Sequence, residues 1–256
     1  MRNPSLPVLL SAFLLCVCGK ADLSKFARIE VPPVPDGEVT EYQVLVQDEQ
    51  IGFYTMTTHQ VDFRGTPVWR FDLVSKTVQG NIPTIDSSTV FVTRDSMRPL
   101  SAFRFIRTGA ALVTTAASYV PGSVAIATYT PQGEKQRMLP IGPFSYDADQ
   151  LTALGRAIRL PTTGKPIDIQ VVNPMGPPTG GAVFDGKIGV AGEGTVTVPA
   201  GTFDCDKLIL NAGPHVIALW YEKTGSRRMI RYAAPGGSMI MELLPPGSIP
   251  RPEPIR

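Results

Sequence analysis

Residues 198–208 read Val-Pro-Ala-Gly-Thr-Phe-Asp-Cys-Asp-Lys-Leu, and this stretch indicates how the chain is built. Pro199 fixes its φ near the value that starts a turn, and Gly201 can adopt a φ that other residues avoid. The polar residues on either side of Phe203 can hydrogen-bond the local backbone, while Phe203 points into a core as the next strand begins. The stretch therefore predicts a corner between two β-strands, with a ligand contact as the alternative.

The segments on both sides of this corner alternate apolar and polar residues, as half-buried strands do. The chain also holds 24 glycines and 25 prolines, which suits many short strands joined by turns. We expect strands at 42–46, 51–60, 69–73, 90–92, 103–105, 111–120, 124–130, 167–172, 182–190, 194–198, 203–211, 216–222, 228–233 and 239–244. The pattern predicts an all-β (mainly β) fold, in which a large antiparallel sheet curls into a half-open β-barrel.

One segment has helical periodicity instead. Leu151, Leu154 and Ile158 recur at helical spacing, and Asp147 and Asp149 precede them, where acidic residues favour the positive end of the helix dipole. We therefore expect one helix near residues 147–159. Such a helix can cover the concave side of the curl, and any part that it leaves uncovered would be a lipophilic pocket.

The first 21 residues have the pattern of a secretory signal peptide. Arg2 supplies a positive start, residues 6–17 are apolar apart from Ser11, and small residues follow. This run is shorter than the roughly twenty residues that a membrane-spanning helix needs. We expect an exported protein, in the periplasm or at the outer membrane of a Gram-negative bacterium. A retained anchor or a buried N-terminal helix is the alternative.

After this signal peptide at 1–21, we expect a Pro-rich linker at 22–39, a single β-rich envelope domain at 40–244 and a disordered Pro-rich tail at 245–256. The formal net charge is +2, and the longest run of basic residues is a pair. Nucleic-acid binding proteins carry a basic patch, so this composition argues against such a partner.

Two of the three cysteines, Cys16 and Cys18, lie in the leader. Each half-resembles the cleavage site of a bacterial lipoprotein, so lipidation of one of them is the alternative to simple cleavage near Gly19 or Ala21. The domain body keeps a single thiol, Cys205, and therefore has no disulfide framework of its own.

Five features follow one another along the chain: a hairpin at 42–60, the helix sequence at 149–154, the corner at 198–208, Trp220-Tyr221, and a closing Arg-x-x-Arg-Tyr at 228–232. Their order resembles the exported bacterial family of unknown function DUF3108, over residues 40–244. The resemblance implies a β-rich exported domain related in shape to the LolA and LolB lipoprotein carriers. It implies no defined reaction. The chain departs from the family pattern in its Pro-rich loop at 173–181 and in its tail.

Catalytic motifs are poorly represented. Cys205 with His59 or His215 is the one nucleophile–base combination, and Asp204 and Asp206 beside the thiol would raise its pKa. Two scattered histidines and one thiol do not offer the clustered ligands of a zinc site, so no metal is expected. We expect Cys205 to be a buried structural thiol and the protein not to be an enzyme, with no cofactor.

A set of aromatic and methionine residues suggests a binding site more strongly than any catalytic motif does, because such side chains line adaptable apolar pockets. The hypothetical pocket comprises Phe53, Met56, Trp69, Phe71, Phe103, Phe105, Trp220, Met239 and Met241. Ordinary packing in a β core is the alternative for the same residues.

We therefore expect a non-catalytic exported protein that binds a lipid, a lipoprotein or another hydrophobic ligand, or another envelope protein. A structural or protein-interaction module of the cell envelope with a filled core is the alternative. A hydrolase that uses Cys205 is a more distant one.

Overall fold

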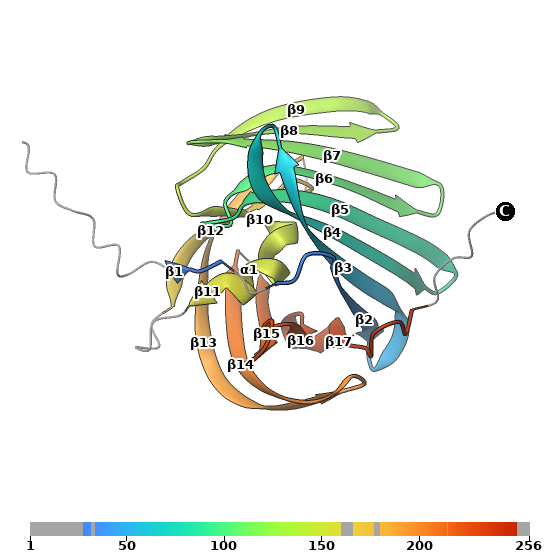
Figure 1. The fold of residues 1–256 in the computed structure, drawn as a ribbon. Helices are drawn as coiled ribbons and strands as arrows, with labels where there is room; N and C mark the ends of the chain where they lie inside the picture. The colour runs from blue at the N-terminus through green and yellow to red at the C-terminus, as the bar shows by residue number, and fades with distance from the viewer. Residues whose placement is uncertain (1–27, 32–33, 160–165, 177–179, 214, 250–256) are drawn as a thin grey trace, which may run out of the picture.

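The computed structural model describes residues 28–31, 34–159, 166–176, 180–213 and 215–249. Within these residues, fifteen strands form one large sheet that curls around a short helix, α1 (Leu151–Ala157), without closing into a barrel (Figure 1). The strand order is β10-β12-β13-β14-β15-β16-β17-β2-β3-β4-β5-β6-β7-β8-β9. The prediction of an all-β fold with a curled sheet and one helix is confirmed.

The strands of this sheet are long and follow one another mostly as hairpins. They are β2 (Glu38–Val46), β3 (Glu49–Phe63), β4 (Thr66–Gln79), β5 (Ile82–Thr93), β6 (Pro99–Thr108), β7 (Ala111–Val120), β8 (Ser123–Thr130), β9 (Gly133–Pro140), β10 (Ser145–Asp147), β12 (Ile167–Asn173), β13 (Ala182–Val198), β14 (Gly201–Ala212), β15 (His215–Glu222), β16 (Met229–Ala233) and β17 (Ile240–Leu243). Two further strands, β1 (Arg28–Ile29) and β11 (Ile158–Arg159), pair only with each other.

All neighbouring pairs of the large sheet are antiparallel except β10 and β12, which run parallel. The helical segment between these two strands explains the exception, because a parallel pair needs a crossover connection and a helix usually provides it. The prediction of a wholly antiparallel sheet is corrected at this one pair. The sheet ends at β10 on one edge and at β9 on the other.

The corner at 198–208 is the hairpin between β13 and β14. Val198 pairs with Gly201, whose φ is 132°, and Pro199 lies in the turn between them. The two strands expected at 182–190 and 194–198 are a single strand, β13. A bulge between Val190 and Gly192 interrupts its pairing, and this local irregularity accounts for the break in the sequence pattern.

Strand β9 was not expected, because its sequence lacks alternating apolar residues. Seven of its eight residues are exposed, and the eighth is half-buried. It forms through backbone pairing with β8 at the edge of the sheet, where no inner face demands an apolar pattern.

The helix is shorter than the 147–159 expected. A 3₁₀ turn, η2 (Ala148–Gln150), precedes α1, and the chain leaves the helix at Ile158 to form β11. Asp147 caps the start: its carboxylate accepts a hydrogen bond from the Asp149 backbone N–H at 2.8 Å. The Gln150 side chain accepts from the Asp147 backbone N–H at 3.2 Å and completes a capping box.

Helix α1 packs against the inner face of the sheet and is held there by hydrogen bonds and an ion pair. The Tyr221 hydroxyl donates to the Thr152 carbonyl at 3.0 Å. The buried guanidinium of Arg156 pairs with Glu38 at 2.5 Å and donates to the Ser226 carbonyl at 2.8 Å. These contacts join the helix to both the first and the late strands of the sheet.

Apolar side chains from the inner face and the helix form one core. Its fully buried members include Tyr42, Met56, Trp69, Phe71, Val90, Leu154, Ile167, Ile188, Leu208 and Tyr221. The inner face around the helix is therefore filled with side chains.

The described parts of the two flanking segments contact the domain. Within the expected linker, Val34 is buried and the Glu30 backbone N–H donates to the Ala157 carbonyl at 2.9 Å. Within the expected tail, the Ser248 backbone N–H donates to the Glu41 carboxylate at 2.8 Å. The signal peptide at 1–21, with Cys16 and Cys18, and residues 250–256 lie outside the described residues.

Candidate functional site

The two faces of strands β3–β7 differ because their register assigns alternate residues to opposite sides. Thr58, Phe71, Val90 and Ala102 pair across the strands and are all buried on the inner face. The next row along contains Phe103, which is 48% exposed on the outer face. Adjacent residues of one strand therefore belong to the core and to the surface.

The outer face carries an unusual number of exposed apolar side chains. Of the exposed large apolar residues in strands β4–β9, all except Ile82 point outward. They are Val78, Phe103, Leu112, Val120, Tyr129 and Met138. Scattered surface apolar residues are normal in soluble proteins, but apolar residues gathered on one face suggest an interaction surface.

Two neighbouring grooves run over this face. One, of about 370 Å³, is lined by Ile85, Phe103, Phe105, Arg107, Leu112 and Thr114. The other, of about 480 Å³, is lined by residues of β3, β4 and β5 that include Phe53, Lys76, Val78 and Ile85. Ile85 borders both grooves, so they lie side by side. Among the described residues that line them, only Lys76 and Arg107 are charged.

We call this surface the outer strip. It comprises Phe53, Lys76, Val78, Ile85, Phe103, Phe105, Arg107 and Leu112. One cross-strand row runs through its centre: Phe53 pairs with Lys76, Lys76 with Ile85, Ile85 with Arg107, and Arg107 with Leu112. Apolar and basic side chains therefore alternate across five strands.

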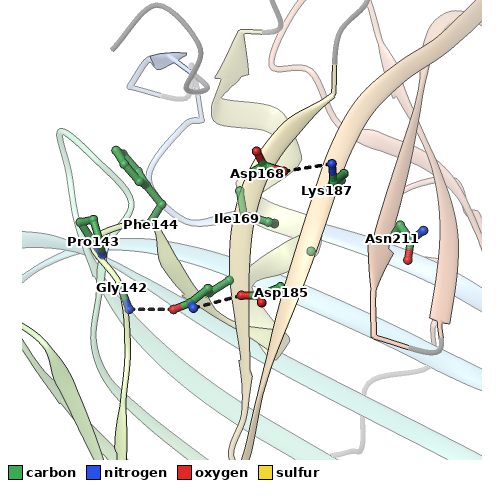
Figure 2. Close-up of a pocket in the computed structure, with 10 residues that line it drawn as sticks. Gly142, Pro143, Phe144, Asp168, Ile169, Asp185, Lys187 and Asn211 are labelled. Atoms are coloured by element: carbon green, nitrogen blue, oxygen red, sulfur yellow. Dashed lines mark hydrogen bonds and ion pairs between the residues drawn. The ribbon is translucent and has the colours of Figure 1, made fainter. Parts of the chain in front are cut away.

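A larger hollow of about 530 Å³ lies near the opposite edge, between residues 142–144 and strands β12–β14 (Figure 2). Most of its polar side chains bond one another, and Asn211 is the exception among the described residues. Gln170 accepts from the Gly142 backbone N–H at 2.7 Å and donates to Asp185 at 3.1 Å, and Lys187 pairs with Asp168 at 3.4 Å. These bonds hold the 142–144 segment against the sheet, so the polar groups have a structural role already.

A polar cluster lies on the inner face at the start of the helix. Arg104 donates to Asp86 at 2.8 Å and to Asp149 at 2.9 Å, and the Tyr119 hydroxyl donates to Asp147 at 2.5 Å. Burial, followed by repulsion from Asp149, raises the pKa of Asp147 to about 7. Burial also raises the pKa of Asp149. The cluster holds the helix start against β5, β6 and β7.

A small cavity of about 80 Å³ adjoins this cluster, with a lining that includes Tyr54, Ser88 and Arg104. It has room for a few ordered waters.

Cys205 is buried in β14. Burial raises the pKa of its thiol to about 11, with further contributions from Glu222, Asp204 and Asp206. A thiol with a raised pKa is a weak nucleophile because it is rarely ionised. Of the two histidines proposed as partners, His59 lies in β3 near Asp72, with 3.9 Å between its Nε2 and the carboxylate. The side chain of His215 lies outside the described residues.

The nine aromatic and methionine residues do not line one pocket. Met56, Trp69, Phe71 and Met241 are buried in the core. Phe53, Phe103 and Phe105 lie on the outer strip. Trp220 lies on the outer face of β15, where Lys207 and Arg231 approach its ring at 5.0 and 5.7 Å. Met239 is half-buried just before β17.

The sequence pointed to Phe53, Phe103 and Phe105 of the outer strip, although as members of one apolar pocket, and it missed the rest. The spacing along β6 is a signal that could have added Arg107. Phe103, Phe105 and Arg107 are spaced two apart in β6, which places them on one face of a strand. Their partners Ile85, Lys76 and Leu112 come from other strands. Only the register of the folded sheet brings them together.

A profile of the family described as "Protein of unknown function (DUF3108)" matches residues 39–243. The chain belongs to this family. The match agrees with the resemblance over residues 40–244, and it brings no reaction with it. No curated protein matches the chain at a significant level. The likeness in shape to the LolA and LolB carriers stays a prediction.

One solved structure supports the fold of this DUF3108 domain. The chain is similar to a β-barrel-like protein of the domain of unknown function DUF1849 from Brucella abortus, with a TM-score of 0.54 and 10% identity, covering 85% of this chain and 98% of that one. A second protein, from Bacteroides fragilis, is described as exported and as having a YmcC-like fold. It matches at a TM-score of 0.33 and 8% identity, again covering 85% of this chain and 98% of that one. The first likeness concerns the fold alone, and the second is too distant to support an argument.

Among the described residues, there is no helix that is both long enough and apolar enough to cross a membrane.

Proposed function

We propose that this DUF3108 protein is a non-catalytic exported protein of the cell envelope that binds a lipid or another amphiphile on the outer strip of its sheet. The observation that carries the proposal is the pair of adjacent grooves, about 370 and 480 Å³, lined mainly by apolar side chains from five strands. Grooves of this size and lining suit an acyl chain.

The filled inner face supports an external binding surface. The residues that the sequence suggested for an internal pocket, such as Trp69 and Phe71, are 1% exposed and contact other core residues. Binding in the part of the curl that α1 fills would have to displace the helix and break its contacts with Tyr221 and Glu38. The outer grooves are open without any such rearrangement.

The state of the one candidate nucleophile supports a non-catalytic role. Cys205 is buried, and the pKa of its thiol is raised to about 11. Most polar side chains of the larger hollow at β12–β14 are already paired: Gln170 bonds Asp185, and Lys187 pairs with Asp168. Among the described residues of this hollow, Asn211 is the exception. The signal peptide pattern of residues 1–21 supports export.

The test is binding of a fluorescent lysophosphatidylcholine, which is zwitterionic and therefore probes apolar contact rather than net charge. We expect the wild-type chain to bind it, and Phe103→Ser combined with Leu112→Ser to weaken binding by more than about tenfold, because two apolar contacts are lost. Val216→Ser is the matched control: Val216 is an exposed valine on β15, 45% accessible and outside the strip. It should leave binding unchanged.

Two results would overturn the proposal. The first is a wild-type chain that does not bind the lysolipid, which would favour a protein-interaction module instead. The second is binding that the double variant and the Val216→Ser variant weaken to the same extent, which would place the binding site elsewhere.

A further inference from the structure

The outer strip combines apolar side chains with two cations that have no acidic partner. Lys76 and Arg107 are both exposed, and neither takes part in an ion pair with a described residue. By contrast, exposed Lys187 pairs with Asp168, and exposed Lys223 pairs with Glu193. The strip thus presents uncompensated positive charge.

The cations occupy fixed positions among the apolar residues. In the central row, Lys76 lies between Phe53 and Ile85, and Arg107 lies between Ile85 and Leu112. Long basic side chains can lay their alkyl stems along apolar neighbours while their charged ends reach the headgroup level. Aromatic residues such as Phe105 and the nearby Tyr129 suit the interfacial region of a bilayer.

We propose that the outer strip docks on a lipid bilayer with anionic headgroups, with its apolar side chains at the acyl boundary and with Lys76 and Arg107 against the phosphates. This inference rests on the proposed function, because it names the amphiphile that the strip contacts. Peripheral proteins bind such surfaces through apolar burial combined with attraction between basic residues and anionic lipids. The complementary charge is the reason for choosing a bilayer of this kind over a neutral one.

The geometry of the curl restricts docking to one side of the molecule. Strand β14 lies on the opposite side of α1 from strands β4–β6 (Figure 1). The basic side chain of Lys207 on β14 therefore faces away from a bilayer that contacts the strip. It also lies against the ring of Trp220, at 5.0 Å. Lys207 is thus a matched cation for a control.

The experiment is co-sedimentation of the chain with two kinds of vesicle: phosphatidylcholine alone, and phosphatidylcholine with phosphatidylglycerol in equal parts. We expect about fivefold tighter binding to the anionic vesicles for each cation, or roughly 30-fold for the two. Lys76→Glu combined with Arg107→Glu should remove this preference. Raising the salt concentration should weaken wild-type binding to the anionic vesicles, because exposed charges are screened.

Lys207→Glu is the matched control and should keep the preference for anionic vesicles. If the doubly reversed variant fails to fold, Lys76→Gln combined with Arg107→Gln makes the same test by removing the charges without adding new ones. Equal wild-type binding to both vesicles would overturn this inference, and so would an equal loss in Lys207→Glu. In either case, binding of the zwitterionic lysolipid would leave the proposed function standing, whereas its failure would remove both.

Discussion

The inner and outer faces of strands β3–β7 are built from alternate residues of the same strands, yet they use their aromatic side chains in opposite ways. Phe71 on the inner face is 1% exposed and lies in the core, whereas Phe103 on the outer face is 48% exposed and borders a groove. The inner face is covered by α1 and by the later strands. Apolar residues on a β-strand therefore indicate burial only where the fold supplies a cover.

The sharpest test of this difference is to truncate one phenylalanine on each face. Phe71→Ala should lower the free energy of unfolding by about 3–5 kcal/mol, because it removes a buried ring and leaves a cavity. Phe103→Ala should change it by less than about 0.5 kcal/mol, as for most surface substitutions. Urea unfolding of the two variants measures both values. Similar losses in the two would mean that the outer face is covered.

The second test uses the buried carboxylate on the inner face. The pKa of Asp147 is raised to about 7, so the folded state binds a proton more tightly than the unfolded chain does. The contribution of Asp147 to stability is therefore fully present below the ordinary carboxyl pKa of 3.8 and is lost as the pH rises through about 7. The expected loss from this group is on the order of 2–4 kcal/mol.

Urea unfolding across this pH range checks the expectation. Asp147→Asn cannot ionise, yet its amide oxygen can still accept from the Asp149 backbone N–H, so the variant should show a flatter dependence of stability on pH. Asp168→Asn is the control, because Asp168 lies on the surface with 76% of its side chain exposed. If the stability of the Asp147→Asn variant depended on pH as steeply as that of the wild type, Asp147 would not be the group that causes the dependence.

The third test concerns the contact between helix α1 and strand β15. A Cβ at Gly155 would lie 2.2 Å from the Tyr221 hydroxyl oxygen, much closer than atoms can approach. Gly155→Ala should therefore destabilise the protein by about 1–3 kcal/mol, although alanine is the better helix former. Thermal unfolding measures the effect, with Gly194→Ala as control, because a Cβ there meets nothing within 4 Å. A neutral Gly155→Ala would mean that the helix can move away from β15.

Much of the fold was predictable from local pattern. The hairpin of β2 and β3, the hairpin of β7 and β8, and the corner between β13 and β14 all follow from alternating residues around Gly- and Pro-containing or polar turns. The helix start was also predictable, since Asp147 and Gln150 form a capping box. These features depend on residues close together in the chain, and a sequence displays such residues directly.

Other features depended on distant segments. Strand β9 has no apolar alternation and exists because β8 offers it a partner. Strand β10 has three residues and pairs parallel with β12 across the helical crossover. The hypothetical pocket of nine residues combined members of both faces, because the sequence does not show which side of a strand the rest of the chain will cover.

Periodicity, turn residues and a leader pattern were enough to predict most of the secondary structure, the family and the expectation of export. Only the tertiary structure decided which apolar residues are core and which form the outer strip. The physical reason is that a strand exposes two faces that look alike in sequence. The register that aligns Phe53, Lys76, Ile85, Arg107 and Leu112, and the helix that covers the opposite side, arise from contacts between segments far apart in the chain.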